Sequence, residues 1–270
     1  MSHTFPSHWS VPDHTVAFFA PKTHDTVLVI PVINEGERIL GQLAAIQAAA
    51  PGVDVVLVDG GSTDGSMEAT RLQSLGVRAL ITKTGPGKLS AQLRCAYAVA
   101  LMEGYTGIVT MDGNGKDGAD GVQRIADRLA AGADYVQGSR YAQGGVDERT
   151  PLERAFANRL IHAPLMSWAG GKRLTDTTNG FRGYSSRYLN DPRVLPFRDV
   201  FVRYELLFYL TARAGQIGMQ VEEIGVARSY PESGPTPTKI GGWKAKLDVL
   251  RQTVNAARGA YHPKGTDGGR

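Results

Sequence analysis

Three scarcities in this sequence each exclude a class of protein. Cys95 is the only cysteine in 270 residues, so an internal disulfide framework is impossible and a reducing compartment is indicated. No run approaches the roughly 18 apolar residues that would cross a bilayer, and the N-terminus has no charged-then-apolar signal layout. We therefore predict a cytoplasmic chain without a transmembrane segment, and we leave open peripheral contact with the inner face of the membrane.

The excess of positive over negative charge is also small, since the net charge is +4 and the pI about 9.2. This balance suits an anionic substrate or lipid surface and is too weak to indicate nucleic acid binding. Several catalytic and nucleotide motifs are absent: Gly-x-Gly-x-x-Gly after a strand, His-Glu-x-x-His and Gly-x-Ser-x-Gly. Residues 85–89 are like part of a P-loop, but Thr82 replaces its first glycine and Leu89 its Ser or Thr.

What is present is a regular alternation of apolar runs and helical segments. The predicted strands are 26–31, 54–59, 77–82, 107–111 and 134–137, and the helices between them are 37–50, 66–74, 88–103 and 118–131. This order predicts an α/β fold with a mostly parallel, Rossmann-like sheet flanked by helices. Beyond residue 138 we predict helices over 151–169 and 202–214, a strand over 219–227 and a loop over 229–238.

The two ends of the chain differ from the middle. Residues 1–25 contain four histidines, three prolines and no periodicity, which predicts a mobile or draped N-terminal arm. A catalytic domain would span 26–242, followed by an amphipathic helix and tail over 243–270. Trp243, Leu247, Leu250 and Val254 form one stripe of that helix. We interpret the stripe as packed on the domain, and the alternative is a helix lying on an anionic membrane.

Polar clusters follow three of the predicted strands. Asn34 and Glu35 follow the first, Asp59 ends the second, and Asp112 follows the fourth. In open α/β sheets, ligands bind beyond the carboxyl ends of the strands, so these clusters should converge. Asp112 has no neighbouring Cys or His, and such a carboxylate suits Mg²⁺ or Mn²⁺ together with substrate phosphates.

These motifs together resemble the family 2 nucleotide-sugar glycosyltransferases of the GT-A fold. The segments concerned are 31–35 (Pro-Val-Ile-Asn-Glu), 58–65 (Val-Asp-Gly-Gly-Ser-Thr-Asp-Gly) and 111–114 (Met-Asp-Gly-Asn). Segments 134–141, 176–182 and 222–228, with Glu205, resemble the branch of dolichol-phosphate mannose synthases and bacterial polyprenyl-phosphate glucosyltransferases. The resemblance spans about residues 26 to 246.

The resemblance implies roles for individual residues. Those implied at the donor nucleotide are Pro31, Asn34, Glu35, Asp59, Lys88 and Asp112, and the candidate phosphate clamps are Arg140, Arg182, Arg228 and Lys239. The metal would be held by Asp112 and Asn114. The family usually has Asp-x-Asp here, so Asn114 supplies less charge, and Asp117 is a candidate to compensate.

The implied reaction is direct displacement at the anomeric carbon with inversion. The sequence does not decide between a UDP-sugar and a GDP-sugar donor, and we favour UDP slightly. Asp176 is the predicted catalytic base and Glu205 the second candidate. The alternatives are a loop carboxylate or helix cap for Asp176, and a buried partner of Arg203 or Arg228 for Glu205. A phosphate acceptor would need little base.

The acceptor would be a polyprenyl phosphate, a saccharide or a small metabolite, and a homo-oligomer stays open. Two other functions remain: a nucleotidyltransferase, or a catalytically inert nucleotide-sugar-binding module.

Overall fold

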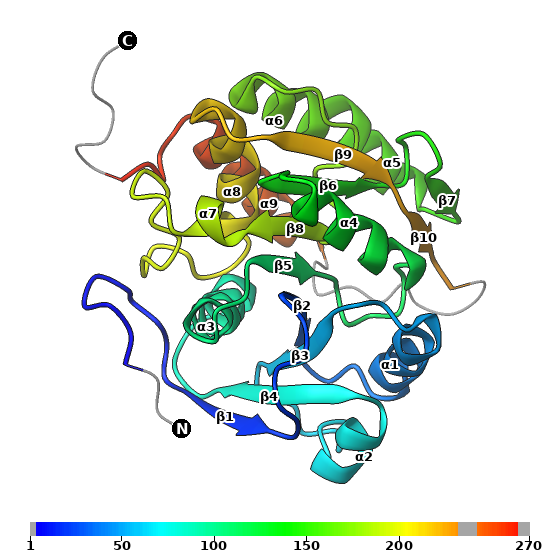
Figure 1. Cartoon of the computed structure of the whole chain (residues 1–270). Helices are drawn as coiled ribbons and strands as arrows, with labels where there is room; N and C mark the ends of the chain where they lie inside the picture. Colours follow the sequence, from blue (N-terminus) through cyan, green and yellow to red (C-terminus); the bar gives the residue numbers. More distant parts are fainter. Residues whose placement is uncertain (1–3, 232–241, 264–270) are drawn as a thin grey trace.

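The computed structural model describes residues 4–231 and 242–263, and it is built on an eight-stranded sheet (Figure 1). The strand order is β1-β4-β3-β2-β5-β8-β6-β9. These strands are β1 (His14–Phe18), β2 (Thr26–Val32), β3 (Asp54–Asp59), β4 (Val77–Lys83), β5 (Gly107–Thr110), β6 (Tyr135–Ser139), β8 (Arg182–Ser185) and β9 (Val221–Gly225). All run parallel except β1 and β8, which confirms the mostly parallel α/β fold.

Helices cover both faces of the sheet, and a short parallel pair lies beside it. The helices are α1 (Glu37–Ala49), α2 (Ala69–Ser74), α3 (Leu89–Met102), α4 (Asp120–Ala130), α5 (Leu152–Ala157), the π-helix η1 (Asn158–His162), α6 (Ala163–Gly170), α7 (Ser186–Leu189), α8 (Glu205–Gln216) and α9 (Gly242–Ala257). The short pair is β7 (Val146–Glu148) with β10 (Ala227–Ser229).

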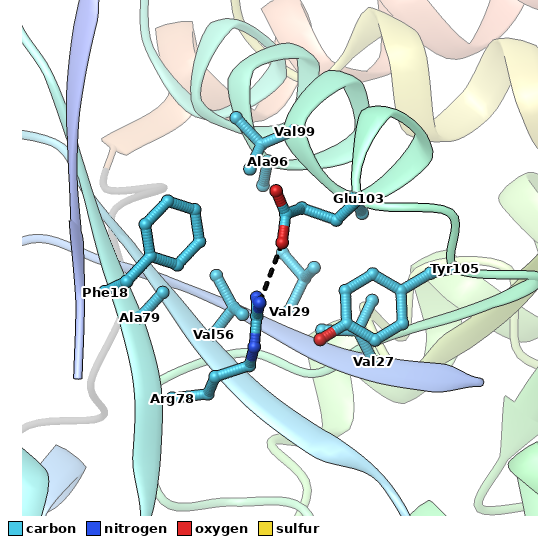
Figure 2. A pocket seen from close by; sticks show the side chains of 11 residues that line it. Phe18, Val27, Val29, Val56, Arg78, Ala79, Ala96, Val99, Glu103 and Tyr105 are labelled. Atoms are coloured by element: carbon cyan, nitrogen blue, oxygen red, sulfur yellow. Dashed lines mark hydrogen bonds and ion pairs between the residues drawn. The ribbon is translucent and has the colours of Figure 1, made fainter. Parts of the chain in front are cut away.

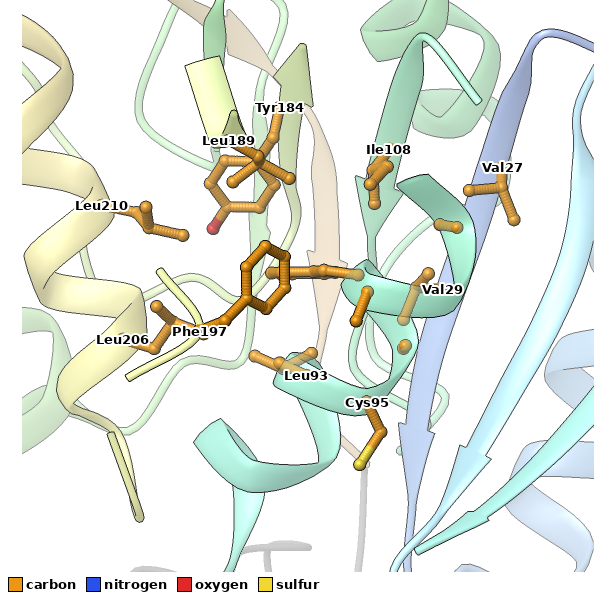
Figure 3. Close-up of a cluster of buried hydrophobic side chains, with 14 of the residues drawn as sticks. Val27, Val29, Leu93, Cys95, Ile108, Tyr184, Leu189, Phe197, Leu206 and Leu210 are labelled. Carbon is orange, nitrogen blue, oxygen red and sulfur yellow. The ribbon is translucent and has the colours of Figure 1, made fainter. Parts of the chain in front are cut away.

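The core around the sheet has two parts because successive strand side chains point to opposite faces, and a third, small cluster packs between α6, α8 and α9. Val27 and Val29 of β2 join the cluster under α3 and α8, which Figure 3 shows with Leu93 and Leu206. Their neighbours Leu28 and Ile30 join the cluster under α1 and α4. A strand that is buried on both faces needs an unbroken apolar run, and this explains why these strands could be predicted from the sequence.

Several elements were not predicted, among them β1, β8 and a π turn. Residues 14–18, expected to be irregular, form the edge strand β1 antiparallel to β4. β8 inserts antiparallel between β5 and β6; it is Arg-Gly-Tyr-Ser, too short and polar to give an apolar signal. The predicted helix over 151–169 is confirmed as α5, η1 and α6, but it contains a π turn at Asn158–His162.

The C-terminal helix α9 faces the domain with a different side from the predicted one. Its buried residues are Gln252, Thr253, Ala256 and Ala257. Trp243 is 70% exposed and Leu247 57% exposed, so the interpretation that they pack on the domain was wrong. Small side chains let α9 lie close to α6 and α8, where a tryptophan would not fit.

No helix in the described part of the chain combines the length and apolarity needed to cross a membrane. Lys239 and most of the loop predicted over 229–238 lie outside the described residues. Cys95 is fully buried on α3 (Figure 3), and burial raises the pKa of its thiol to about 12. It is therefore an unreactive core residue at neutral pH.

Candidate active site at the carboxyl edge of the sheet

The three polar turns meet because β3, β2 and β5 are neighbours that run the same way. The Gly60 N–H donates to the Val32 carbonyl at 2.9 Å, joining the first two turns. A Cβ on Gly113 would lie 3.0 Å from the Pro31 carbonyl oxygen, so the third turn lies directly against the end of β2. Pro31, Glu35, Asp59 and Asp112 therefore share one edge.

Gln42 of α1 holds the Asp112 turn in place. Its Nε2 donates to the Asp112 carbonyl at 2.9 Å, and its Oε1 accepts from the Gly115 N–H at 2.8 Å. Gly180 lies beside the Asp112 carboxylate, where any Cβ would collide with Oδ1. This fixes the position of Asp112 while its side chain keeps 29% of its surface exposed.

The turns after β2 and β3 interlock through Asn34. Its N–H donates to Ser62 Oγ at 2.9 Å, and its Oδ1 accepts from the Thr63 N–H at 2.8 Å. Asn34 has φ +50, in the left-handed region that asparagine tolerates better than most residues. Asn34 thus shapes the turn that presents Glu35.

The predicted donor carboxylates are well fixed. Asp59 is 4% exposed and accepts hydrogen bonds from Ser62 N at 2.9 Å and Ser62 Oγ at 2.6 Å. Glu35 lies 2.9 Å from Arg38 in an ion pair. Gln92 of α3 donates to the carbonyls of Val32 and Val58, both at 2.9 Å, which brings the start of α3 and the exposed Lys88 beside them.

Asp112 belongs to a charge cluster centred on the buried guanidinium of Arg228. Nη1 donates to Asp117 at 2.6 and 2.8 Å and to Asn179 Oδ1 at 3.0 Å, while Nη2 reaches Asp112 at 3.3 Å. Burial lowers the pKa of Arg228, but Asp117 and Asp112 more than reverse this and hold that pKa well above its ordinary value. Arg228 is therefore a fixed positive charge at the edge of the site.

Asp117 does not fit the compensating role predicted for it. Its side chain is 0% exposed, and both of its oxygens accept from Arg228. A metal would have to displace a buried guanidinium to reach it. This leaves Asp112 and the amide oxygen of Asn114 as the predicted ligands that can face a cation.

That donor set is small but suits Mg²⁺ or Mn²⁺. Within residues 4–231 and 242–263, no group of three or more His, Cys, Asp or Glu side chains could hold a metal alone. Mg²⁺ is usually held by one or two carboxylates, water and substrate phosphates. Asp112 and Asn114 therefore fit a cation that arrives with a diphosphate.

The predicted base Asp176 lies in a second buried ion pair. It is 0% exposed and accepts from Arg140 Nε at 2.7 Å, Arg140 Nη2 at 3.1 Å and Asn158 Nδ2 at 3.0 Å. Both carboxylate oxygens are occupied, so neither can accept a proton from an acceptor hydroxyl in this arrangement. The assignments of Asp176 as base and Arg140 as phosphate clamp do not fit this geometry.

Arg182 and Glu205 also support the backbone. Arg182 is 1% exposed and donates to the carbonyls of Asn179, Thr177 and Leu207 at 2.9, 2.7 and 2.7 Å, which leaves no room for a phosphate. Glu205 is 8% exposed and accepts from the N–H groups of Val202 and Arg203 at the start of α8.

The side chain of Arg203 pairs instead with Asp248 at 2.7 Å. The alternative in which Glu205 forms a buried ion pair with Arg203 is therefore not what the structure shows.

Sequence reasoning missed two residues beside Asp112. Lys116 is 5% exposed, and its Nζ lies 5.0 Å above the Tyr230 ring. Burial and the neighbouring Arg228 lower the pKa of Lys116. Burial raises the pKa of Tyr230, but Arg228, Arg140 and Lys116 outweigh this and lower it. The signal available was a lysine four positions after Asp112.

Two cavities lie outside this turn cluster. A small one of about 10 Å³, room for about one water, lies at the amino edge of the sheet (Figure 2). It is lined by Val27, Val56 and Tyr105 and bordered by the Arg78–Glu103 ion pair at 2.7 Å, so it is a packing defect far from the chemistry.

The second cavity holds about 460 Å³ and lies next to the Asp176 loop, at the carboxyl end of β6. Its lining combines cations with apolar and hydroxyl groups: Tyr141, Arg159, Ala163, Pro164, Ser167, Arg173, Leu174 and Thr175.

Comparison with known proteins agrees with this geometry. Residues 27–191 match the model of Glycosyl transferase family 2. The chain belongs to this family. It is accordingly a nucleotide-sugar-dependent glycosyltransferase, and the resemblance found in its motifs is confirmed.

Two curated relatives are similar over most of their length. A polyprenol monophosphomannose synthase of Mycolicibacterium smegmatis is 28% identical, over 86% of this chain and 92% of the relative. An undecaprenyl-phosphate mannosyltransferase of Micrococcus luteus is 29% identical, over 83% of this chain and 91% of the relative.

A solved structure of similar fold is glucosyl-3-phosphoglycerate synthase of Mycobacterium tuberculosis with Mn²⁺, UDP and phosphoglyceric acid. Its TM-score is 0.59 at 17% identity, covering 87% of this chain and 77% of that one. At this identity the likeness supports the GT-A fold alone.

Proposed function

We propose that this glycosyltransferase moves a sugar from a nucleoside diphosphate donor to a phosphate-bearing acceptor, with inversion and with Mg²⁺ or Mn²⁺. One observation carries the proposal: the turns bearing Glu35, Asp59 and Asp112 meet at a single edge of the sheet. Asp112 keeps part of its carboxylate exposed there, beside the fixed charge of Arg228.

The base and ribose of the donor would lie over the turns after β2 and β3. Asp59 and Glu35 are carboxylates fixed at this edge, and carboxylates accept from ribose hydroxyls and from the ring N–H of uracil or guanine. We favour a UDP-sugar over a GDP-sugar, in line with the UDP named in the solved glucosyl-3-phosphoglycerate synthase. Lys88 at the start of α3 would approach the donor phosphates.

The diphosphate would lie at Asp112. Asp112 and Asn114 would hold the cation, which neutralises charge on the departing diphosphate. Arg228 and Lys116 add positive charge beside them, and their hydrogen-bonded or stacked positions mean that little reorganisation is needed during the reaction.

The two predicted bases are both unavailable, and this favours an acceptor that is already ionised. Asp176 and Glu205, the two predicted bases, are both occupied by donors from the protein. A phosphate oxygen needs no proton removed; it would attack the anomeric carbon while the bond to the diphosphate oxygen breaks and that oxygen keeps the electron pair. The pocket containing Arg159 and Arg173 offers cations for such a phosphate.

We favour a lipid phosphate, because the two relatives reported above are named for polyprenol or undecaprenyl-phosphate mannosylation. Apolar residues in the same pocket, Pro164 and Leu174, suit the first part of a lipid chain.

The test is a donor screen with UDP- and GDP-sugars, measuring release of free nucleoside diphosphate with and without polyprenyl phosphate. We expect release with one donor, stimulated by the lipid, and a loss of at least about 100-fold in Asp112→Ala. The matched control is Asp120→Ala, whose exposed carboxylate pairs with Arg124 at the start of α4. Release of pyrophosphate in a parallel reaction supplied with UTP or GTP and a sugar 1-phosphate would indicate a nucleotidyltransferase, and equal rates in Asp112→Ala and wild type would refute the assignment.

A further inference from the structure

Exposed apolar side chains are concentrated on two helical segments away from the donor turns. Twelve large hydrophobic residues are exposed among those described, and seven of them lie on α5–η1–α6 or on α9. These seven are Leu152, Phe156, Leu160, Ile161, Trp168, Trp243 and Leu247. We call this region the α5–α9 surface.

On the first segment the apolar residues recur every four positions. Leu152 is 88% exposed, Phe156 62%, Leu160 61% and Trp168 76%, with the exposed Pro164 between the last two. In a regular α-helix, turning about 100° per residue, this spacing would wander by about 160° from Leu152 to Trp168. The wider π turn at Asn158–His162 turns less per residue and brings the later residues back towards the same line.

The start of α9 extends this stripe sideways. Lys246 pairs with Glu153 at 2.7 Å, and Thr253 Oγ1 lies 3.0 Å from His162 Nδ1, so the two helical segments run parallel. Trp243 and Leu247 lie roughly 60–100° from Lys246 around α9. Leu152 and Phe156 lie about 60–100° from Glu153 around the first segment, but with the opposite direction of rotation. Lys246 and Glu153 mark where the two parallel helices face each other. Turning away from that contact in opposite directions therefore leads to the same side of the molecule.

The positive charge of the chain is concentrated in the same place. Residues 152–175 and 242–251 contain seven Lys or Arg and two acids, a net +5, whereas the whole chain carries +4. The remaining 236 residues therefore sum to −1. Lys244, Arg159 and Arg251 are among the exposed cations, and Lys244 Nζ lies 5.7 Å over the Trp243 ring.

We propose that the α5–α9 surface binds the face of an anionic lipid bilayer. Apolar side chains bordered by Lys and Arg are the composition that places a helix in the headgroup region, and Trp168 and Trp243 are the residue type most enriched at that depth. Arg159 and Pro164 also line the 460 Å³ pocket, so the pocket opens beside this surface. The inference does not depend on donor chemistry, because it rests on a different region.

The experiment is sedimentation of the full chain with vesicles of phosphatidylcholine, with or without phosphatidylglycerol. We expect binding to the phosphatidylglycerol vesicles and little to the neutral ones. Half-burial of each leucine or phenylalanine should contribute about fivefold, so the triple variant L152S/F156S/L160S should bind about 100-fold more weakly. Lys244→Gln should weaken binding about fivefold. Two of the three tryptophans lie on the surface, so their fluorescence should shift to the blue on binding.

The matched control is M102S/V200S, which removes two exposed apolar residues elsewhere, at 42% and 47% exposure. All variants change exposed positions and should keep the wild-type Tm, which circular dichroism checks. Equal binding by the triple variant and wild type, or equal affinity for both vesicle types, would overturn the proposal. The proposal would also be overturned if the wild-type chain bound no vesicles but formed a dimer that the triple variant did not form, because the surface would then join two copies of the chain.

Discussion

Carboxylates are held in two different ways at the two ends of the sheet edge. Next to β2 and β3, Asp59 and Asp64 accept hydrogen bonds from N–H and hydroxyl groups of neighbouring turns, such as Ser62, Ser66 and Gly36. In the loops after β5 and before β8, the side chains of Asp117 and Asp176 are fully buried, and each faces a guanidinium at 2.6 or 2.7 Å.

The difference matters for both stability and function. A buried carboxylate paired with arginine is strongly coupled to its partner, since removing one leaves the other as an unpaired buried charge. Loss of the exposed Asp64 carboxylate removes only hydrogen bonds that water can replace. Asp112 lies between the two regions, touching Arg228 yet partly exposed, and this makes it the carboxylate best placed to meet a ligand.

The largest expected effect on stability comes from breaking the buried Asp176–Arg140 ion pair. Asp176→Ala should lower the free energy of unfolding by about 3–5 kcal/mol, because Arg140 is then buried without its partner. Asp64→Ala, on the other side, should lower it by no more than about 1 kcal/mol. Urea unfolding of both variants measures the contrast.

A double variant provides the control for this prediction. D176L/R140M removes both charges and should recover much of the stability lost in Asp176→Ala. Equal losses in Asp176→Ala and Asp64→Ala would mean that the two kinds of carboxylate do not differ as described.

The second effect concerns the turn side, where backbone conformation matters more than charge. Asn34→Ala loses the hydrogen bond from Thr63 and forces alanine into φ +50, so we expect a loss of about 2 kcal/mol in unfolding free energy. Asn34→Gly loses only the hydrogen bond and should cost about 1 kcal/mol. Thermal or urea unfolding separates the two, and a glycine variant less stable than the alanine variant would contradict the conformational part.

The sequence predicted one of these regions far better than the other. The strands β2, β3 and β5 are continuous apolar runs, so the positions of Glu35, Asp59 and Asp112 at one edge could be predicted from order alone. The arginine side could not be predicted in this way. Whether Arg140 faces a phosphate or Asp176 depends on loops about 36 residues apart meeting in space, and no local pattern records that.

Two other misses have the same cause. β8 is recognisable only from its neighbours β5 and β6, because its own four residues carry no apolar signal. The apolar stripe of α9 was correctly predicted, but periodicity does not say which face of a helix packs on the domain. The buried face of α9 contains small residues such as Ala256, which allow close packing, while Trp243 is exposed.

A third prediction tests whether the turn containing Asp112 and Asn114 faces the metal ion. Asn114→Asp adds a carboxylate next to Asp112 and should tighten Mn²⁺ binding about tenfold, most clearly with a nucleoside diphosphate present. Calorimetric titration with Mn²⁺, with and without UDP, measures this without turnover. Asn190→Asp, an exposed position after α7, is the matched control. Unchanged affinity in Asn114→Asp would show that this turn does not face the cation.

The smallest expected effect concerns the pKa of Glu223, a carboxylate on the arginine side that has no arginine partner among its hydrogen bonds to the described residues. Glu223 lies on the arginine side but has neutral hydrogen-bond partners: it accepts from Thr175 N at 2.7 Å, Thr175 Oγ1 at 2.9 Å and Asp176 N at 3.2 Å. Burial raises the pKa of Glu223 above its ordinary value of 4.5, and these hydrogen bonds reverse the shift only in part.

The sign of the pH dependence follows from this raised pKa. Between 4.5 and the folded-state pKa, the folded chain binds more proton at Glu223 than the unfolded chain does, so its contribution to unfolding free energy falls as pH rises through that window. Glu223→Gln cannot titrate. The stability of the variant relative to wild type should therefore increase with pH across the window and be constant above it. Urea unfolding at a series of pH values measures the difference, and a relative stability that decreases with pH would mean that folding lowers the pKa of Glu223 instead of raising it.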